Sequence, residues 1–248
     1  MTAIYGRDFA RVYNEKWESW TERISPFLVE VARQRYPKAS SWLDLCCGTG
    51  FLLRRVVRRG FSAVGVDSSR HQIRHAKRNA PTARFVCRDI REFRLPHRFD
   101  VITCMFDSLN YLTTKSDLLK AFRNAKRHLA GAGVFVFDMN TFEGLEDSWC
   151  RTSATDEQDL TLILQTSFDP KRAVGPCLIT GFVRNARLFR RFQEEHLQRG
   201  YKASEIEELL EKVGLSFRKY DGRTLGRPKK RSGRLIYVCE ITRGKLIA

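Results

Sequence analysis

The sequence predicts an α/β fold in which a doubly wound sheet of seven strands carries an antiparallel β cap. The first observation is a short apolar strand that enters a glycine-rich turn at residues 43–50. A helical pattern and a second apolar strand, ending at Asp67, come next. The second observation is that further apolar strands follow, separated by helical patterns as in parallel βαβ units. The third is a change after residue 140 to alternating segments, which predict an antiparallel insertion after the fifth strand.

The predicted elements describe one sheet domain with a cap. The 248 residues, 42% of them hydrophobic, are enough for a domain of this size. We assign residues 1–140 and 202–248 to the sheet domain, with an N-terminal helical flap, and residues 141–201 to the cap. The strands predicted for the sheet are residues 43–45, 61–66, 83–87, 99–105, 134–137, 215–220 and 235–241. The cap is expected to contain three alternating segments, residues 160–168, 177–184 and 187–199.

Local capping signals predict where several helices begin and end. A Ser-Pro dipeptide is typical of a helix start and predicts a helix over residues 25–36. An apolar face over residues 118–129 predicts a helix that stops at the glycines of residues 131–133. Residues 204–207 form a capping box, which predicts a helix from Ser204.

The glycine turn indicates what kind of ligand the domain binds. Gly48 and Gly50 let the backbone turn sharply and let a ligand approach closely. The third glycine of a dinucleotide fingerprint is missing, since position 53 is Leu53, and no P-loop Lys-Ser or Lys-Thr pair follows the turn. The strand-end carboxylate of Asp67 suits a ribose diol, and Asp44 can hold the loop or meet a cationic head. These residues favour a nucleoside with a positively charged amino-acid tail.

Four motifs, in order, resemble those of the class I S-adenosylmethionine-dependent methyltransferases. Residues 44–50 are similar to the first motif of that family, residues 64–67 to the second, residues 87–90 to the third-strand motif and residues 99–104 to the fourth strand. The resemblance implies a Rossmann-like fold. It also implies an enzyme that uses S-adenosylmethionine and releases S-adenosylhomocysteine.

The resemblance also implies contacts to the cofactor. Asp89 would meet the adenine amino group, and the backbone N–H of Ile90 would meet the adenine ring. The complete predicted cofactor site, including the residues of the turn, comprises Tyr5, Tyr13, Trp20, Asp44, Cys46, Cys47, Gly48, Thr49, Gly50, Asp67, Ser68, Asp89, Ile90, Met105 and Phe106.

Aromatic residues near the N-terminus have two interpretations. Phe9, Tyr13, Trp17 and Trp20 recur at helical spacing, which is typical of a core-facing amphipathic helix. In the resembled family, a Tyr-Asp-type segment near the N-terminus covers the methionine end of the cofactor. Here Tyr13 precedes Asn rather than Asp, and Tyr5 is a second candidate for that role. Aromatic faces near a sulfonium would add cation–π attraction.

Three residues are candidates for catalysis. The segment after the fourth strand is expected to face the methyl group, because ligands bind outside the carboxyl ends of parallel strands. Asp107 lies there, close to Asn110 and Tyr111, and either acts as a base or caps the next helix. Asn140 ends the fifth strand. His196 shares one face of a cap strand with Phe192 and Glu194, and either lines a substrate pocket or is a hydrogen-bonded strand histidine.

The cap also carries a resemblance. The pattern Phe-x-Glu-Glu-His-x-x-Arg-x-Tyr is similar to a bacterial subgroup of small-molecule methyltransferases with an antiparallel cap, related to sugar-amine and glycine-type N-methyltransferases. Its residues are Phe192, Glu194, Glu195, His196, Arg199 and Tyr201. The resemblance implies in-line methyl transfer to a nitrogen or oxygen of a small-molecule acceptor.

The charge of the chain favours a different partner. Lys and Arg number 45 against 28 Asp and Glu, which gives a net charge of +17 and attraction to polyanions. A basic loop, residues 221–234, adds to this field and supports RNA methylation as an alternative. The basic residues are spread over several helices, however, and no RNA-binding module is recognisable. A third alternative is a cofactor-binding protein without catalysis.

The remaining expectations concern location and assembly. Seven cysteines without a C-x-x-C pattern predict reduced thiols, a cytoplasmic protein and no metal site. No apolar run approaches the ~18 residues of a membrane span, and residues 1–7 lack a signal-peptide pattern. We expect no membrane partner and a monomer or homodimer.

Overall fold

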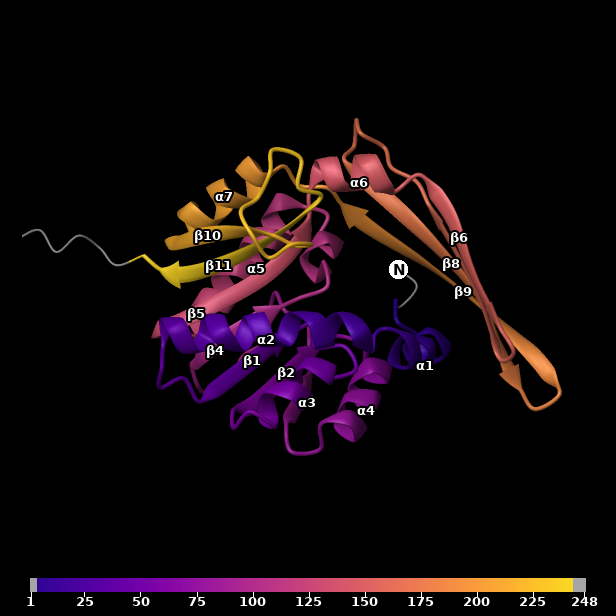
Figure 1. Cartoon of the computed structure of the whole chain (residues 1–248), viewed down its shortest axis with the longest axis horizontal. Helices are drawn as coiled ribbons and strands as arrows, with labels where there is room; N and C mark the ends of the chain where they lie inside the picture. Colours follow the sequence, from indigo (N-terminus) through magenta and orange to yellow (C-terminus); the bar gives the residue numbers. More distant parts are fainter. Residues whose placement is uncertain (1–3, 243–248) are drawn as a thin grey trace, which may run out of the picture.

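The computed structural model describes residues 4–242 and contains two separate sheets (Figure 1). The larger has seven strands in the order β10-β11-β5-β4-β1-β2-β3, and the smaller has four in the order β6-β7-β8-β9. The predicted fold class is confirmed. The strands of the larger sheet are β1 (Ser41–Leu45), β2 (Ser62–Asp67), β3 (Arg84–Cys87), β4 (Phe99–Cys104), β5 (Leu129–Asn140), β10 (Leu215–Asp221) and β11 (Arg234–Ile241).

The larger sheet is parallel except at one edge. Strand β1 pairs in parallel with both β2 and β4, while β11 runs antiparallel between β5 and β10. The chain winds outward from β1 in one direction through β2 and β3, then in the other through β4 and β5. The strand order therefore reverses at β1, and a ligand crevice is expected beside the carboxyl ends of β1, β2 and β4.

Helices cover both faces of this sheet because successive strand residues point to opposite sides. In β5, Phe135 and Phe137 pack toward α5 (Lys115–His128) and α7 (Ala203–Lys212). The alternate residues Val134 and Val136 pack toward the other layer. That layer consists of α2 (Glu18–Arg35), α3 (Phe51–Val57) and α4 (Arg70–Asn79).

The smaller sheet packs on the N-terminal helix. Its strands are β6 (Arg151–Glu157), β7 (Leu160–Thr166), β8 (Val174–Asn185) and β9 (Leu188–Arg199). Phe9 and Val12 of α1 (Arg7–Lys16) form a third core cluster with Leu160 and Ile179 of this sheet. Figure 1 shows α1 between the long four-stranded sheet and the rest of the molecule. The cap is therefore joined to the body by apolar contacts as well as by the chain.

Two predicted helix ends are wrong. Helix α2 begins at Glu18 and contains Pro26, because the packing of Ile24 and Leu28 outweighs the hydrogen bond that proline cannot donate. Helix α5 ends at His128, and the glycines at 131–133 belong to β5. A Cβ at Gly133 would lie 2.8 Å from the Asp100 carbonyl oxygen, so this glycine allows two strands to approach.

Other boundaries follow contacts that the sequence pattern does not contain. Helix α7 begins at Ala203, not Ser204, and Glu205 Oε2 accepts a hydrogen bond from Lys202 N at 2.9 Å. No helix or strand was predicted before residue 160 of the cap, yet this part contains α6 (Phe142–Ser148) and β6. Every residue of β6 is exposed, so its backbone pairing with β7 holds it in place without an apolar pattern.

Candidate active site

A cavity lies at the carboxyl ends of β1, β2 and β4, where the strand order reverses. The loops after these strands form its floor, and aromatic residues of the N-terminal segment, α1 and α2 form its opposite wall. All the predicted cofactor residues except Gly50 line it. Its wall also includes Trp17, Gln72, Ser108, Tyr111 and Leu112.

Gly50 serves packing rather than the cavity. Its φ of 78° lies in the left-handed region. A Cβ there would lie 3.0 Å from the Cβ of Ala76 in α4. This glycine therefore lets α3 start close to α4, and it does not line the cavity.

Asp67 holds the glycine turn in place. Its Oδ2 accepts a hydrogen bond from Gly48 N at 2.9 Å, and its Oδ1 accepts one from Ser69 N at 2.8 Å. Burial raises the pKa of this carboxyl, while the two backbone N–H groups act in the opposite direction. Each oxygen keeps a second lone pair, so a ribose diol could donate to it. The residue fits the predicted role.

Asp44 is a buried carboxyl on the cavity wall, 4% exposed. Its Oδ1 accepts a hydrogen bond from the Thr103 hydroxyl at 2.7 Å, and that hydroxyl accepts one from Trp42 Nε1 at 2.9 Å. Burial raises the pKa of Asp44 to about 7 although the Thr103 hydrogen bond lowers it. A cation beside this group would compensate its desolvation, which suits the amino group of the methionine tail.

Gln72 supplies an acceptor that no protein group satisfies. Its side chain is 2% exposed and lies on the cavity wall. Within residues 4–242, Oε1 has no hydrogen-bond partner. A buried acceptor of this kind normally has a partner, so Gln72 indicates that a ligand with a donor belongs in the cavity. The sequence analysis did not find this residue.

Asp89 also lies on the cavity wall, but Arg91 holds it. The Arg91 Nη2 lies 2.6 Å from Asp89 Oδ2, and this pairing holds the pKa of Asp89 below its usual value. The carboxylate is thus charged and oriented by a residue two positions further along the chain. The contact to the adenine amino group stays a prediction.

The N-terminal aromatic residues divide between the two places considered for them, the core and the cavity wall. Phe9 is buried against the cap, whereas Tyr13, Trp17 and Trp20 line the cavity. Tyr13 stacks on Trp17 with centroids 5.4 Å apart and rings 6° from parallel. The chain breaks at Trp17 into two helices, so the helical spacing of the four aromatic residues does not represent a single helix.

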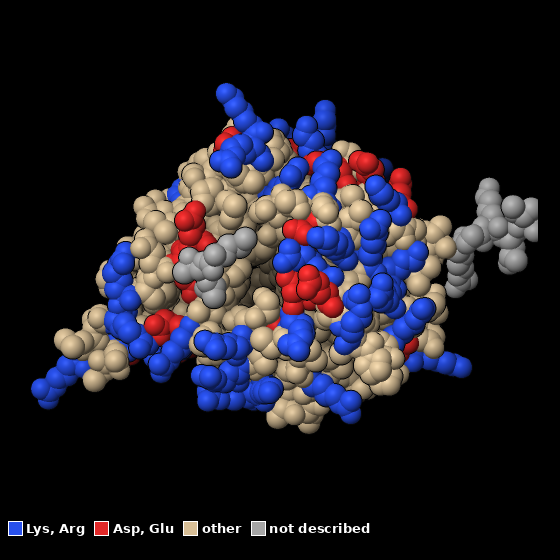
Figure 2. Space-filling view, turned by 180° about the vertical axis from the view of Figure 1, so that it is seen from behind, with Lys and Arg blue, Asp and Glu red and all other residues tan. Residues whose placement is uncertain are grey.

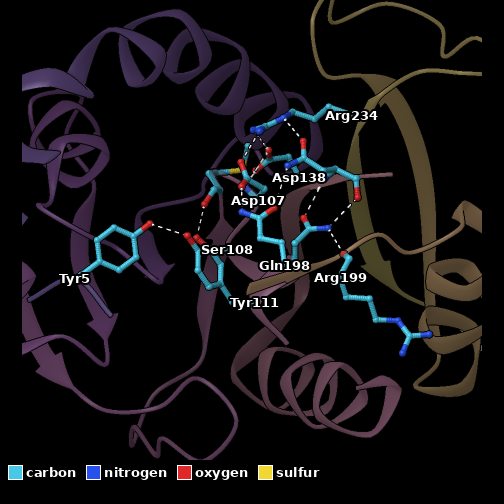
Figure 3. A network of polar contacts seen from close by, with 11 residues as sticks. Tyr5, Asp107, Ser108, Tyr111, Asp138, Gln198, Arg199 and Arg234 are labelled. Carbon is cyan, nitrogen blue, oxygen red and sulfur yellow. Dashed lines mark hydrogen bonds and ion pairs between the residues drawn. The ribbon is translucent and has the colours of Figure 1, made fainter. Parts of the chain in front are cut away.

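The three predicted catalytic residues do not line the cavity. Asp107 belongs to a polar network directly behind it, shown in Figure 3. Its carboxylate forms an ion pair with Arg234 and accepts a hydrogen bond from Gln198. Asp107 is the N-cap residue of the short helix η1 (Ser108–Tyr111), and its carbonyl accepts a hydrogen bond from Asn110 N at 3.0 Å, but its carboxylate makes no capping bond.

Arg234 is the centre of this network. Its guanidinium lies between Asp107 and Asp138, with Nη1 2.6 Å from Asp138 Oδ2. Its Nε donates to Asn140 Oδ1 at 3.2 Å, which places Asn140 in the network as well. Burial opposes the charge of Arg234, but the two carboxylates raise its pKa. Burial raises the pKa of Asp138 to about 6, with Arg234 acting in the opposite direction.

This network holds a strained turn beside the cavity. Phe106 and Asp107 have φ values of 67° and 46°, and a residue other than glycine costs roughly 1–2 kcal/mol in the left-handed region. The Arg234 ion pair and the hydrogen bond from Gln198 fix Asp107 in that conformation. Phe106 is thereby held against Trp20, with ring centroids 4.1 Å apart, on the cavity wall.

His196 is a buried, hydrogen-bonded histidine of strand β9, 2% exposed. Its Nδ1 lies 2.8 Å from the hydroxyl of Tyr111, and its Nε2 lies 2.9 Å from Glu194 Oε2. Glu194 also accepts hydrogen bonds from the backbone N–H groups of Tyr5 and Gly6, at 2.7 and 2.8 Å. The cap strand therefore holds the N-terminal segment over the cavity.

Sequence reasoning missed two further residues of the site. Gln198 continues the alternation of Phe192, Glu194 and His196, so the period of the strand could have placed it on the same face. Arg234 was grouped with the exposed basic residues of its loop. No local signal separates it from them, because only the pairing of β11 with β5 brings it to Asp107.

Two kinds of feature do not occur in residues 4–242. No helix among them is long and apolar enough to span a membrane. They also contain no group of three or more His, Cys, Asp or Glu side chains placed to hold a metal ion.

The fold and the cavity together define a class of protein. A sheet with this strand order, a glycine turn after β1 and carboxyls at the ends of β1 and β2 is typical of enzymes that bind S-adenosylmethionine. A methyltransferase domain family matches residues 43–133. "Putative methyltransferase YqeM" of Bacillus subtilis (strain 168) is 30% identical over 243 residues, covering 94% of this chain and 95% of the relative. The chain therefore belongs to the S-adenosylmethionine-dependent methyltransferase family.

A solved structure and a curated enzyme support this assignment. A crystal structure of an S-adenosylmethionine-dependent methyltransferase from Clostridium acetobutylicum ATCC 824 has a TM-score of 0.85 and 27% identity, covering 95% of this chain and 98% of that one. The dTDP-4-amino-2,3,4,6-tetradeoxy-D-glucose N,N-dimethyltransferase of Saccharopolyspora spinosa is 34% identical over 141 residues. That match covers 55% of this chain and 56% of the relative.

Asp67→Asn tests the ribose assignment. We expect S-adenosylmethionine to bind about 10- to 100-fold more weakly, because a hydrogen bond to a charged group is worth about 1.5–3 kcal/mol. Isothermal titration calorimetry measures this. Asp100→Asn is a matched control, since Asp100 also accepts backbone N–H groups, from Ser40 and Ser41, but at the opposite end of the strands. Equal affinities for the two variants would refute the assignment.

The raised pKa of Asp44 predicts that the affinity for the cofactor depends on pH. With its pKa raised to about 7, this carboxyl is mostly protonated below that pH, and a bound cation favours the ionised form. Binding therefore releases a proton, and affinity rises from about pH 5.5 to pH 7, approaching tenfold per pH unit. Isothermal titration calorimetry in two buffers of different ionisation enthalpy measures the number of protons released on binding. Asp44→Asn should remove most of this pH dependence of the affinity and leave only the part that comes from Asp67. If the affinity of the wild type does not depend on pH, the role of Asp44 is wrong.

Arg234→Met tests the network. Removing one partner of a buried ion pair costs about 3–5 kcal/mol, so the free energy of unfolding in urea should fall by that amount. Arg227→Met is the control, because Arg227 is exposed in the same loop, and it should change stability by less than about 0.5 kcal/mol. Similar midpoints for Arg234→Met and the wild type would contradict the structural role of Arg234.

Proposed function

We propose that this methyltransferase transfers the methyl group of S-adenosylmethionine to the amino nitrogen of a small molecule, with amino sugars as the first class to test. The observation that supports a small acceptor is the closure of the cavity by the N-terminal segment, which Glu194 of the cap binds through the N–H groups of Tyr5 and Gly6. The sugar-amine activity of the Saccharopolyspora relative supports nitrogen as the acceptor atom.

The chain's residues align the reactants and exclude water. S-Adenosylmethionine supplies an already activated methyl group, so no covalent enzyme intermediate is needed. Tyr13, Trp17 and Trp20 exclude water from one wall of the cavity, and the turn at Phe106 forms another. Alignment of this kind can contribute about 7–11 kcal/mol to lowering the barrier.

Asp107 is better suited to positioning than to proton transfer. Arg234 engages one of its oxygens and Gln198 the other, and its side chain does not reach the cavity. We therefore assign Asp107 and Asn140 the role of holding the turn that carries Phe106. Any base that contacts the acceptor has to come from another residue of the wall.

RNA is the less favoured acceptor. Figure 2 shows Lys and Arg side chains in several areas of one face of the molecule, with Asp and Glu side chains among them, rather than in a single patch. In the basic loop, Arg234 is buried in the network and Arg231 is paired with Asp147 at 2.7 Å. The loop thus offers fewer free charges than its sequence suggests. Membership of an enzyme family argues against a cofactor-binding protein without catalysis.

The proposal also covers the location of the protein and its oligomeric state. We infer a cytoplasmic location, because an odd number of scattered cysteines is typical of reduced thiols in that compartment. A monomer and a homodimer are both compatible with this site.

A panel of acceptors tests the proposal. We expect S-adenosylhomocysteine to form with nucleotide-linked amino sugars, glycine or sarcosine, and the product to gain the mass of one or more methyl groups. Matched sugars with a hydroxyl in place of the amine should give no product. Transfer RNA serves as the polyanionic alternative. Methylation of the hydroxyl sugars alone, or of RNA alone, would overturn the proposal. With any acceptor, Asp67→Asn should lower the signal at limiting S-adenosylmethionine.

A further inference from the structure

Three side chains, joined by hydrogen bonds, lead from the cavity wall into the protein. Tyr111 lines the cavity, and its hydroxyl lies 2.8 Å from Nδ1 of His196. The Nε2 of His196 lies 2.9 Å from Oε2 of Glu194. Figure 3 shows Tyr111 and Tyr5 pointing toward one another at the start of this chain, and their hydroxyls are 3.3 Å apart.

The hydrogen bonds of Glu194 determine the direction of the chain. A carboxylate only accepts, and Glu194 already accepts from the backbone N–H groups of Tyr5 and Gly6. The Nε2 of His196 therefore carries a proton and donates it to Glu194. Nδ1 is then the acceptor, so the Tyr111 hydroxyl donates to it. The Tyr5 hydroxyl, 3.3 Å away, then donates to the Tyr111 oxygen, whose second lone pair is left for the cavity.

We propose that Tyr111 is the acceptor-facing end of a Tyr111–His196–Glu194 relay that removes a proton from the acceptor amine; this inference rests on the proposed function. An N–H bond of the acceptor ammonium breaks, and its electron pair stays on nitrogen as the proton moves to the Tyr111 oxygen. The hydroxyl proton of Tyr111 moves to Nδ1 of His196. The products are a neutral amine, which is the nucleophile, and an imidazolium beside the Glu194 carboxylate.

The surroundings of His196 suit a charge that forms during the reaction. Phe9 and Tyr5 pack edge-on against the imidazole, with centroids 5.3 and 5.0 Å away, so solvent does not reach it. In such a site the attraction between imidazolium and carboxylate is stronger than in water. Glu194 thus has the function that a carboxylate has in a catalytic triad, since it fixes the tautomer and stabilises the cation.

The pH behaviour of the relay depends on a small set of neighbouring groups. Burial raises the pKa of Tyr111, so the phenol stays neutral and passes protons rather than holding a charge. The ionisable groups that face the relay are Glu194 from β9, Tyr5 from the N-terminal segment, Cys177 opposite His196 on β8, and Asp107, whose charge Arg234 offsets.

The hydrogen-bond chain can be tested without an acceptor. In the protein labelled with ¹⁵N-histidine and saturated with S-adenosylhomocysteine, we expect His196 to be the Nε2–H tautomer at pH 7. Tyr111→Phe should shift its Nδ1 resonance, because that nitrogen loses a hydrogen bond. Tyr220→Phe, a tyrosine packed on Phe27 away from the cavity, is the matched control and should leave the resonance unchanged. An Nδ1–H tautomer, or no response to Tyr111→Phe, would overturn the relay.

The proton transfer itself is tested by the pH dependence of turnover with the amine that the wild type methylates fastest. We expect kcat to fall as the pH falls, because proton transfer from Tyr111 requires that Nδ1 of His196 can accept a proton. Tyr111→Phe should lower kcat by about 100-fold and remove that dependence, with the KM for S-adenosylmethionine unchanged. If Tyr111→Phe keeps the kcat and the pH profile of the wild type, the relay is wrong and the proposed function still stands. If the wild type methylates no amine, the proposed function fails and the relay fails with it.

Discussion

The ion pair between Arg234 and two carboxylates is the interaction on which the site depends. The guanidinium joins the start of β11 to Asp107 after β4 and to Asp138 near the end of β5. Asp107 in turn binds Gln198 of the cap. Asp138 is fully buried and the side chains of Asp107 and Arg234 are mostly buried, so the loss of any one charge leaves the others poorly compensated. The pair therefore fixes the floor of the cavity and its attachment to the cap at the same time.

The cofactor half of the site was predictable because its signals are local. The glycine turn, the carboxyl before it and the carboxyl of Asp67 lie within one βαβ unit, and each has a chemical reason at its own position. The network behind the cavity has no such signal. Asp107 and Arg234 are 127 positions apart, and Arg234 is one of several basic residues in its loop. Only the register that pairs Arg234 with Asn140 selects it.

The same distinction explains the errors in secondary structure. Pro26 is a local signal for a helix start, but it lies within α2 because the apolar face of that helix packs along the sheet. Strand β6 has no buried residue, so periodicity could not show it; it exists through hydrogen bonds to β7. In both cases tertiary contacts outweigh local propensity. Predictions from sequence are thus most reliable where one short segment contains the whole reason for its conformation.

The difference between local signals and tertiary contacts also applies to the part of the site that would bind the acceptor. The cavity wall comes from the N-terminal segment, α1 and α2, from the turns after β1, β2 and β4, and from Tyr111, while Glu194 of β9 lies behind this wall and holds the N-terminal segment. The matched methyltransferase domain covers residues 43–133, which include the cofactor cradle but neither β9 nor the N-terminal segment. Family membership therefore accounts for the methyl donor. We expect acceptor specificity to depend on both parts of the cavity wall, since Phe106 and Tyr111 lie within the matched domain and Tyr5 and Tyr13 lie outside it.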